Sequence, residues 1–184
     1  MRLLDGSPAA ELSLRMVARE AGVAAPSVYA HFDSAETMMS EIVRECWRQL
    51  GEEMSHDARQ VEGQGAFARL KAQMTAHVRY AMERPSRYQL LFALQRDVWA
   101  WRDQPGPVRP AYLPVHETVE LLEAEGSALP MADARASTIL ILSIAHGRIA
   151  LAQLAPHRPG NTSAGVEVFV REALDGLFQR PGGP

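Results

Sequence analysis

The residues of this chain that could perform covalent chemistry are few and widely separated. Cys46 is the single cysteine among 184 residues, and His77, His116 and His146 belong to no recognisable catalytic motif. Catalysis needs a nucleophile or an acid/base pair held together in a cleft, and a structural zinc site needs several ligands at fixed spacing. Cys46 also falls in the apolar stripe of a predicted helix, as a small buried hydrophobe does. We therefore expect a binding protein, with no enzyme activity, no metal and no cofactor.

Composition places the chain among ordinary folded proteins. Hydrophobic residues make up 47% and charged residues 22%, as in typical globular domains. A single cysteine favours a reducing, cytoplasmic compartment. The most apolar run, residues 139–154, is interrupted by polar residues, so no membrane span is expected. The net charge is −3, and the first 50 residues hold five arginines against seven acidic residues, so a nucleic-acid surface would have to be local.

Apolar residues recur at helical spacing along the chain, which predicts an all-α fold. Near the N-terminus, Ser13 is placed to cap a short helix that Gly22 ends. Pro26 is placed in the first turn of a second short helix, which ends near His31. Two short helices joined by a glycine-containing turn match the helix-turn-helix plan.

The residues of these two helices carry a family resemblance. Segment 12–32, LSLRMVAREAGVAAPSVYAHF, resembles the signature of the TetR family of transcriptional repressors. The resemblance implies a three-helix head whose first helix is largely missing here: only Met1 to Asp5 resembles its final turn, and residues before Met1 would have to complete it. It also implies that the second short helix enters the major groove of DNA. The expected base-edge contacts are Ala25, Pro26, Ser27 and His31, and the expected phosphate contacts are Ser13, Arg15 and Tyr29.

Some of these assignments have alternatives. Tyr29 either contacts a phosphate or packs two helices together, and His31 either contacts DNA or caps and packs. Ala35 stands where the family usually has a lysine, so one phosphate contact is absent. Asp33 and Glu36 are spaced as a capping box for a long helix, at about 35–54. We predict a DNA-binding head at 1–54 and a regulatory, ligand-binding and dimerisation domain at 55–184.

The second domain is expected to hold a ligand pocket. Helical patterns occupy about 67–84, 88–92, 112–125, 133–154 and 166–178. Residues 82–92 and 144–147 resemble a subgroup of TetR C-terminal domains with a His-Gly pair in the penultimate helix, which implies a small-molecule site among the middle helices. Apolar and aromatic candidates with a few polar tips are Met74, His77, Val78, Tyr88, Phe92, Val98, Trp99, Trp101, Tyr112 and His146. The alternative is core packing, with Gly147 permitting a close helix approach.

The helix expected at about 133–154 is apolar on nearly every side and must be covered on every side. Its own domain would cover one side and a partner subunit the other. The predicted dimer contacts are Ile139, Leu142, Ile144, Val170, Leu174 and Leu177. The predicted function is a homodimer that binds a double-stranded DNA operator and is released by a small apolar or aromatic effector. The alternative is a helical ligand-binding or interaction dimer that does not bind DNA.

Overall fold

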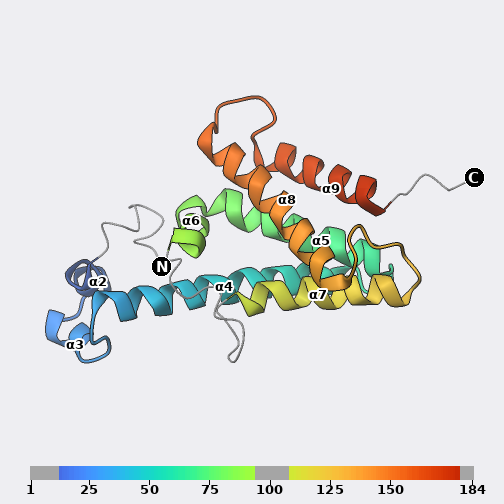
Figure 1. The fold of residues 1–184 in the computed structure, drawn as a ribbon. Coiled ribbons are helices and arrows are strands. Elements are labelled where there is room, and N and C mark those ends of the chain that lie inside the picture. The colour runs from blue at the N-terminus through green and yellow to red at the C-terminus, as the bar shows by residue number, and fades with distance from the viewer. Residues whose placement is uncertain (1–12, 94–107, 179–184) are drawn as a thin grey trace, which may run out of the picture. The chain divides into compact units, whose positions relative to one another are not determined.

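The structure is a computed structural model that describes residues 13–93 and 108–178. Every regular element within these residues is a helix (Figure 1), which confirms the all-α prediction. The helices are α2 (Leu14–Ala21), α3 (Ala25–Tyr29), α4 (Ala35–Gln60), α5 (Ala66–Glu83), α6 (Pro85–Ala93), α7 (Arg109–Ala124), α8 (Ala134–Leu154) and α9 (Ser163–Phe178). Three predicted pocket residues, Val98, Trp99 and Trp101, lie outside the described residues.

Helix α4 differs from its prediction at both ends. The Oγ of Ser34 accepts a hydrogen bond from the backbone N–H of Thr37 at 3.0 Å, so Ser34, and not Asp33, caps the first turn. The reason is register: in a helix that begins at Ala35, the capping position is residue 34. At its other end α4 continues to Gln60, six residues beyond the predicted Met54.

The chain divides into two compact units, and the division falls inside α4. Among the described residues, the first unit comprises 13–48, 84–93 and 108, and the second comprises 49–83 and 109–178. Helix α6 therefore belongs with the N-terminal helices by its contacts. The functional boundary at 54 and 55 stays a prediction.

The first unit has a small core that orients its two short helices. Ala18, Val28 and Met38 are buried together. Around them pack the partly buried side chains of Val17, Phe32, Met39 and Ile42. Further along the chain, the ring of Phe92 lies edge-on to Trp47, with centroids 5.6 Å apart, and 5.3 Å from the ring of Tyr88. Apolar burial thus holds α2, α3 and the start of α4 in place.

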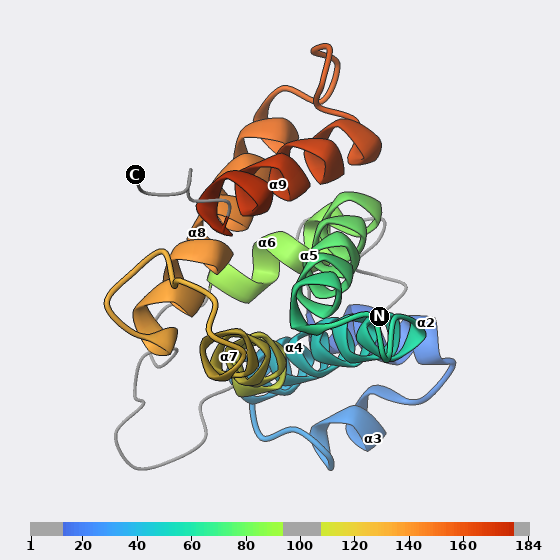
Figure 2. The same cartoon turned by 90° about the vertical axis from the view of Figure 1, so that its right-hand side faces the viewer.

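The second unit is built around α5, which contacts α7, α8 and α9, while α8 and α9 pack side by side (Figure 2). Two glutamines link the helices through backbone carbonyls. Gln73 Nε2 donates to the carbonyl of Pro114 at 2.9 Å, and Gln153 Nε2 donates to that of Ala81 at 3.0 Å. At Gly51 the backbones of α4 and α7 nearly touch, because an added Cβ would lie 2.1 Å from the carbonyl oxygen of Pro110.

Helix α8 is the most apolar element of the second unit. Asp133 caps it, with its side chain accepting a hydrogen bond from the N–H of Ala136 at 2.7 Å. Among the described residues, α8 alone is long and apolar enough to cross a bilayer by length and composition. Ile141, Ala145 and Ile149 are buried in the second unit, so one face of α8 forms part of a protein core.

Candidate functional site

The turn between α2 and α3 is a glycine-terminated helix end. Gly22 has φ +68°, a left-handed conformation that glycine adopts without a steric penalty. The N–H of Gly22 donates to the carbonyl of Arg19 at 3.3 Å, and the N–H of Val23 donates to that of Ala18 at 3.0 Å. This is the Schellman arrangement. It stops α2 and sets the direction in which α3 begins.

Helix α3 buries one side and presents another to solvent. Val28 is buried in the core of the first unit, whereas Pro26, Ser27, Tyr29 and His31 are exposed. Tyr29 is 51% exposed, so half of its surface is open to solvent. The geometry brings together four of the residues predicted to contact DNA.

The flanking predicted contacts have different surroundings. The Oγ of Ser13 accepts a hydrogen bond from the N–H of Met16 at 3.3 Å, so this hydroxyl already caps α2 and keeps its own proton for another acceptor. Arg15 is exposed in the first turn of α2, Ala25 is the first residue of α3, and Ala35 is exposed at the start of α4. Ser13 therefore has a structural role besides the predicted phosphate contact.

The described candidates for the ligand pocket fall in both units. Tyr88 and Phe92 lie in the first unit, where burial raises the pKa of Tyr88. Met74 and Val78 are completely buried on α5 in the second unit, as core packing requires. Tyr112 is half-buried and stacks on His116, with ring centroids 5.3 Å apart. Burial is the largest cause that raises the pKa of Tyr112. The positive charge of Arg135 lowers this pKa, and the carboxylates of Asp133 and Glu120 raise it.

The two histidines of the predicted pocket both lie in the second unit. His77 is buried on α5, and His146 is half-buried on α8. Burial, with a smaller contribution from the charge of His146, lowers the pKa of His77 to about 4. Burial also lowers the pKa of His146. Both rings are therefore neutral at pH 7 and can serve as hydrogen-bonding groups in an apolar region.

Gly147 does not permit a close helix approach within the chain. An added Cβ would meet nothing within 4 Å, and the residue is exposed. No helix in the described part of the same chain therefore packs closely at this glycine, because its face of α8 points to solvent.

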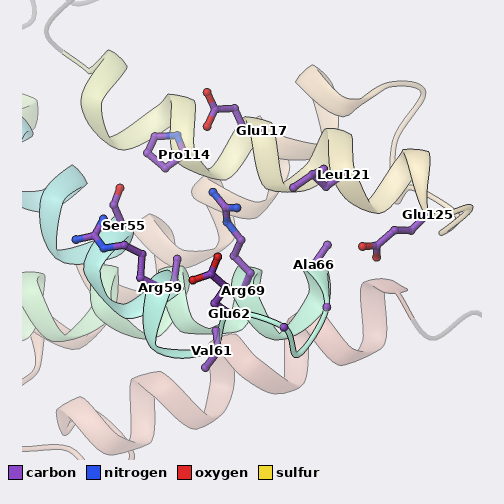
Figure 3. Close-up of a pocket in the computed structure, with 13 residues that line it drawn as sticks. Ser55, Arg59, Val61, Glu62, Ala66, Arg69, Pro114, Glu117, Leu121 and Glu125 are labelled. Atoms are coloured by element: carbon purple, nitrogen blue, oxygen red, sulfur yellow. The ribbon is translucent and has the colours of Figure 1, made fainter.

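A cavity of about 590 Å³ lies elsewhere in the second unit, between the end of α4, the turn that follows it, the start of α5, and α7 (Figure 3). None of the predicted pocket residues lines it. Its charged lining residues are Arg59, Glu62, Arg69, Glu117 and Glu125. The stretch 56–65 holds two glycines beside charged residues of both signs, which is the sequence signal of a shaped polar turn.

The residues predicted to form a dimer interface are partly internal. Val170 and Leu174 are buried, because α9 packs on α5 and α8 of the same chain; they are therefore not available as surface contacts. Leu142, Ile144 and Leu177 keep partial exposure, and Ile139 is exposed. Sequence reasoning missed the other large exposed apolar side chains of α8 and α9, which are Leu151, Leu154, Val168 and Phe169.

Comparison with known proteins gives this arrangement a family. The model described as "Tetracyclin repressor-like, C-terminal domain" matches residues 70–177, and the model described as "Bacterial regulatory proteins, tetR family" matches residues 1–42. The chain therefore belongs to the TetR family and is a DNA-binding transcriptional regulator. Its two matched domains are those of a regulator and point to a non-enzymatic role. The subgroup with a His-Gly pair stays a prediction.

Solved structures share the fold. A protein of unknown function from Rhodococcus sp. RHA1 is 22% identical, with a TM-score of 0.67 over 96% of this chain and 88% of that chain. The TetR family transcriptional regulator PfmR from Thermus thermophilus is 17% identical, with a TM-score of 0.63 over 94% of this chain and 90% of that chain. No curated protein matches the sequence.

Proposed function

We propose that this protein is a cytoplasmic, homodimeric repressor that leaves its DNA operator when a small apolar or aromatic effector binds. The observation that carries the proposal is the exposed face of α3. Pro26, Ser27 and Tyr29 are exposed there and His31 is exposed just beyond the end of the helix, while Val28 is buried. A rigid helix with outward polar and small side chains suits insertion into the major groove.

The exposed apolar surface of α8 and α9 supports a dimer. Gly147, Leu151 and Leu154 follow helical spacing on α8, and Leu151 and Leu154 are 63% and 82% exposed. On α9, Phe169 is also exposed, and the guanidinium of Arg148 lies 5.5 Å from its ring centroid. Contiguous exposed apolar side chains mark interaction surfaces. In a homodimer of helix-turn-helix proteins, the two recognition helices bind half-sites about one DNA turn apart.

Regulation requires an effector that binds the non-DNA conformer more tightly than the DNA-bound one. A coupling free energy of ~1–3 kcal/mol would change operator affinity ~5–150-fold. The candidates in the second unit for contact with such an effector are the half-buried Tyr112 and His146. The charge of His146 also affects the pKa of His77, which is the third candidate. Tyr88 and Phe92 are the candidates in the first unit.

Fluorescence anisotropy tests the DNA-binding part of this proposal. The protein is titrated into labelled DNA from immediately upstream of its own gene and into a scrambled duplex of equal length, at two salt concentrations. We expect tighter binding to the upstream DNA, weakened by salt because phosphate contacts release counterions. Equal affinity for both duplexes would contradict sequence-specific repression at this DNA. Absence of binding to either duplex would favour the interaction dimer without DNA binding.

A further inference from the structure

The cavity of the second unit has the size of a small-molecule site. Its volume of about 590 Å³ lies within the range of ligand pockets, ~300–1,000 Å³. Gly63 and Gly65, with φ +83° and +89°, turn the chain between α4 and α5 and line the cavity. Pro114 and Leu121 of α7 form the facing wall. The space is therefore bounded by two helix ends, a tight turn and one helix face.

Arg69 brings a guanidinium to the lining of this cavity. It lies on α5, and Figure 3 shows its side chain extending toward α7, with the guanidinium between the two helices. Its Nε is buried, and among the described residues it has no hydrogen-bond partner. A buried charged donor without an acceptor is costly. A carboxylate in the cavity would accept from the terminal nitrogens of this guanidinium, in the charge-assisted geometry that arginine favours.

The other lining residues narrow the class of ligand. Glu62, Glu117 and Glu125 also line the cavity and are exposed, so they disfavour a multiply charged anion. The side chains of Val61 and Leu121 offer apolar contact. We propose that this cavity binds a small monocarboxylate with an apolar body, whose carboxylate is held by Arg69. The site is distinct from the residues proposed to contact the effector, and the proposal does not depend on DNA binding.

NMR of the ¹⁵N-labelled full chain tests this site directly, because the Nε–H of an arginine gives its own cross-peak. The Arg69 signal is assigned by its loss in Arg69→Lys. Benzoate is the probe, benzamide is its uncharged isostere, and inorganic phosphate is the multiply charged anion. We expect benzoate to shift the Arg69 Nε–H signal saturably, and benzamide at the same concentrations to leave it unchanged.

Affinity measurements on variants separate the charge from the apolar wall. Arg69→Lys keeps the charge but loses the bidentate fork, and we expect benzoate binding to weaken about tenfold or more, consistent with loss of one charge-assisted contact. Leu121→Gln, at an exposed position that tolerates change, should weaken it a few-fold. The control is Arg171→Lys on α9, an exposed arginine outside the cavity lining, which should bind benzoate within twofold of the unaltered protein.

Three results would overturn the proposal. One is an equal response to benzamide and benzoate, which would remove the role of the carboxylate. Another is binding of phosphate at least as tight as that of benzoate, which would show an anion site without apolar selection. The third is an unchanged benzoate affinity in both Arg69→Lys and Leu121→Gln. Because the titrations contain no DNA, they give the same answer whether or not the operator experiment succeeds.

Discussion

Acidification should destabilise the folded protein through His77, which lies buried on α5. In the unfolded chain a histidine takes up its proton near pH 6.5, whereas burial and the charge of His146 hold the folded pKa of His77 at about 4. Between these two pH values the unfolded state binds more protons than the folded state. The free energy of unfolding therefore falls as the pH falls through this window.

The size of the effect follows from the two pKa values. A difference of about 2.5 pKa units corresponds to a total of ~3 kcal/mol, of which ~2 kcal/mol is already lost on going from pH 7.5 to pH 5.0. Burial also lowers the pKa of His146, so its contribution has the same sign. A loss of this size is a substantial part of the stability of an ordinary domain.

Urea denaturation at pH 7.5 and pH 5.0 measures this loss. In His77→Gln, which cannot take up a proton, we expect the difference in unfolding free energy between the two pH values to shrink by ~2 kcal/mol relative to the unaltered protein. His56→Gln, at an exposed position of α4, is the control and should keep the full difference. The reasoning is refuted if His77→Gln and the unaltered protein lose equal stability, or if NMR titration finds His77 protonated near pH 6.5 in the folded state.

Three further substitutions test other parts of the structure. Gly51→Ala should lower the free energy of unfolding, measured in urea, by ~1–3 kcal/mol, because the new Cβ meets the carbonyl of Pro110. Gly176→Ala, where a Cβ meets nothing, should not lower it. Equal effects of the two substitutions would contradict the close approach at Gly51. Tyr29→Phe should weaken operator binding ~5-fold in anisotropy, through loss of one hydrogen bond of ~1 kcal/mol, with an unchanged melting temperature; unchanged affinity would favour a packing role. Leu151→Glu, 63% exposed before substitution, should give a monomer in analytical ultracentrifugation at micromolar concentration; a persistent dimer would place the interface elsewhere.

Local patterns were enough to predict most of the helices. The expected helix at about 133–154 is observed as Ala134–Leu154 with Asp133 as its cap, and Gly22 ends α2 as expected. Helix periodicity, caps and glycine turns act over a few residues, so the sequence displays them directly. The cap at Ser34 was mistaken for one at Asp33 because a shift of one residue changes the capping atom but hardly changes the pattern.

The candidate sites were predictable only where they depend on one short segment. The exposed face of α3 could be inferred from the signature at 12–32, since neighbouring residues in one helix decide which side is buried. The cavity at Arg69 could not, because α7 supplies its facing wall from Pro114 and Leu121, in a distant part of the chain. The shifted pKa of His77 likewise depends on burial and on His146 of another helix.

The sequence by itself determined that this chain is all-helical, that it contains a helix-turn-helix, and that its last two helices carry more apolar surface than an exposed helix needs. Only the tertiary structure decided which of those apolar side chains are buried by packing within the same chain. Val170 and Leu174 are buried, while Leu151 and Phe169 remain exposed. Hydrophobicity makes burial of a side chain favourable, but packing against α5 and α8 decides which side chains are buried within the same chain.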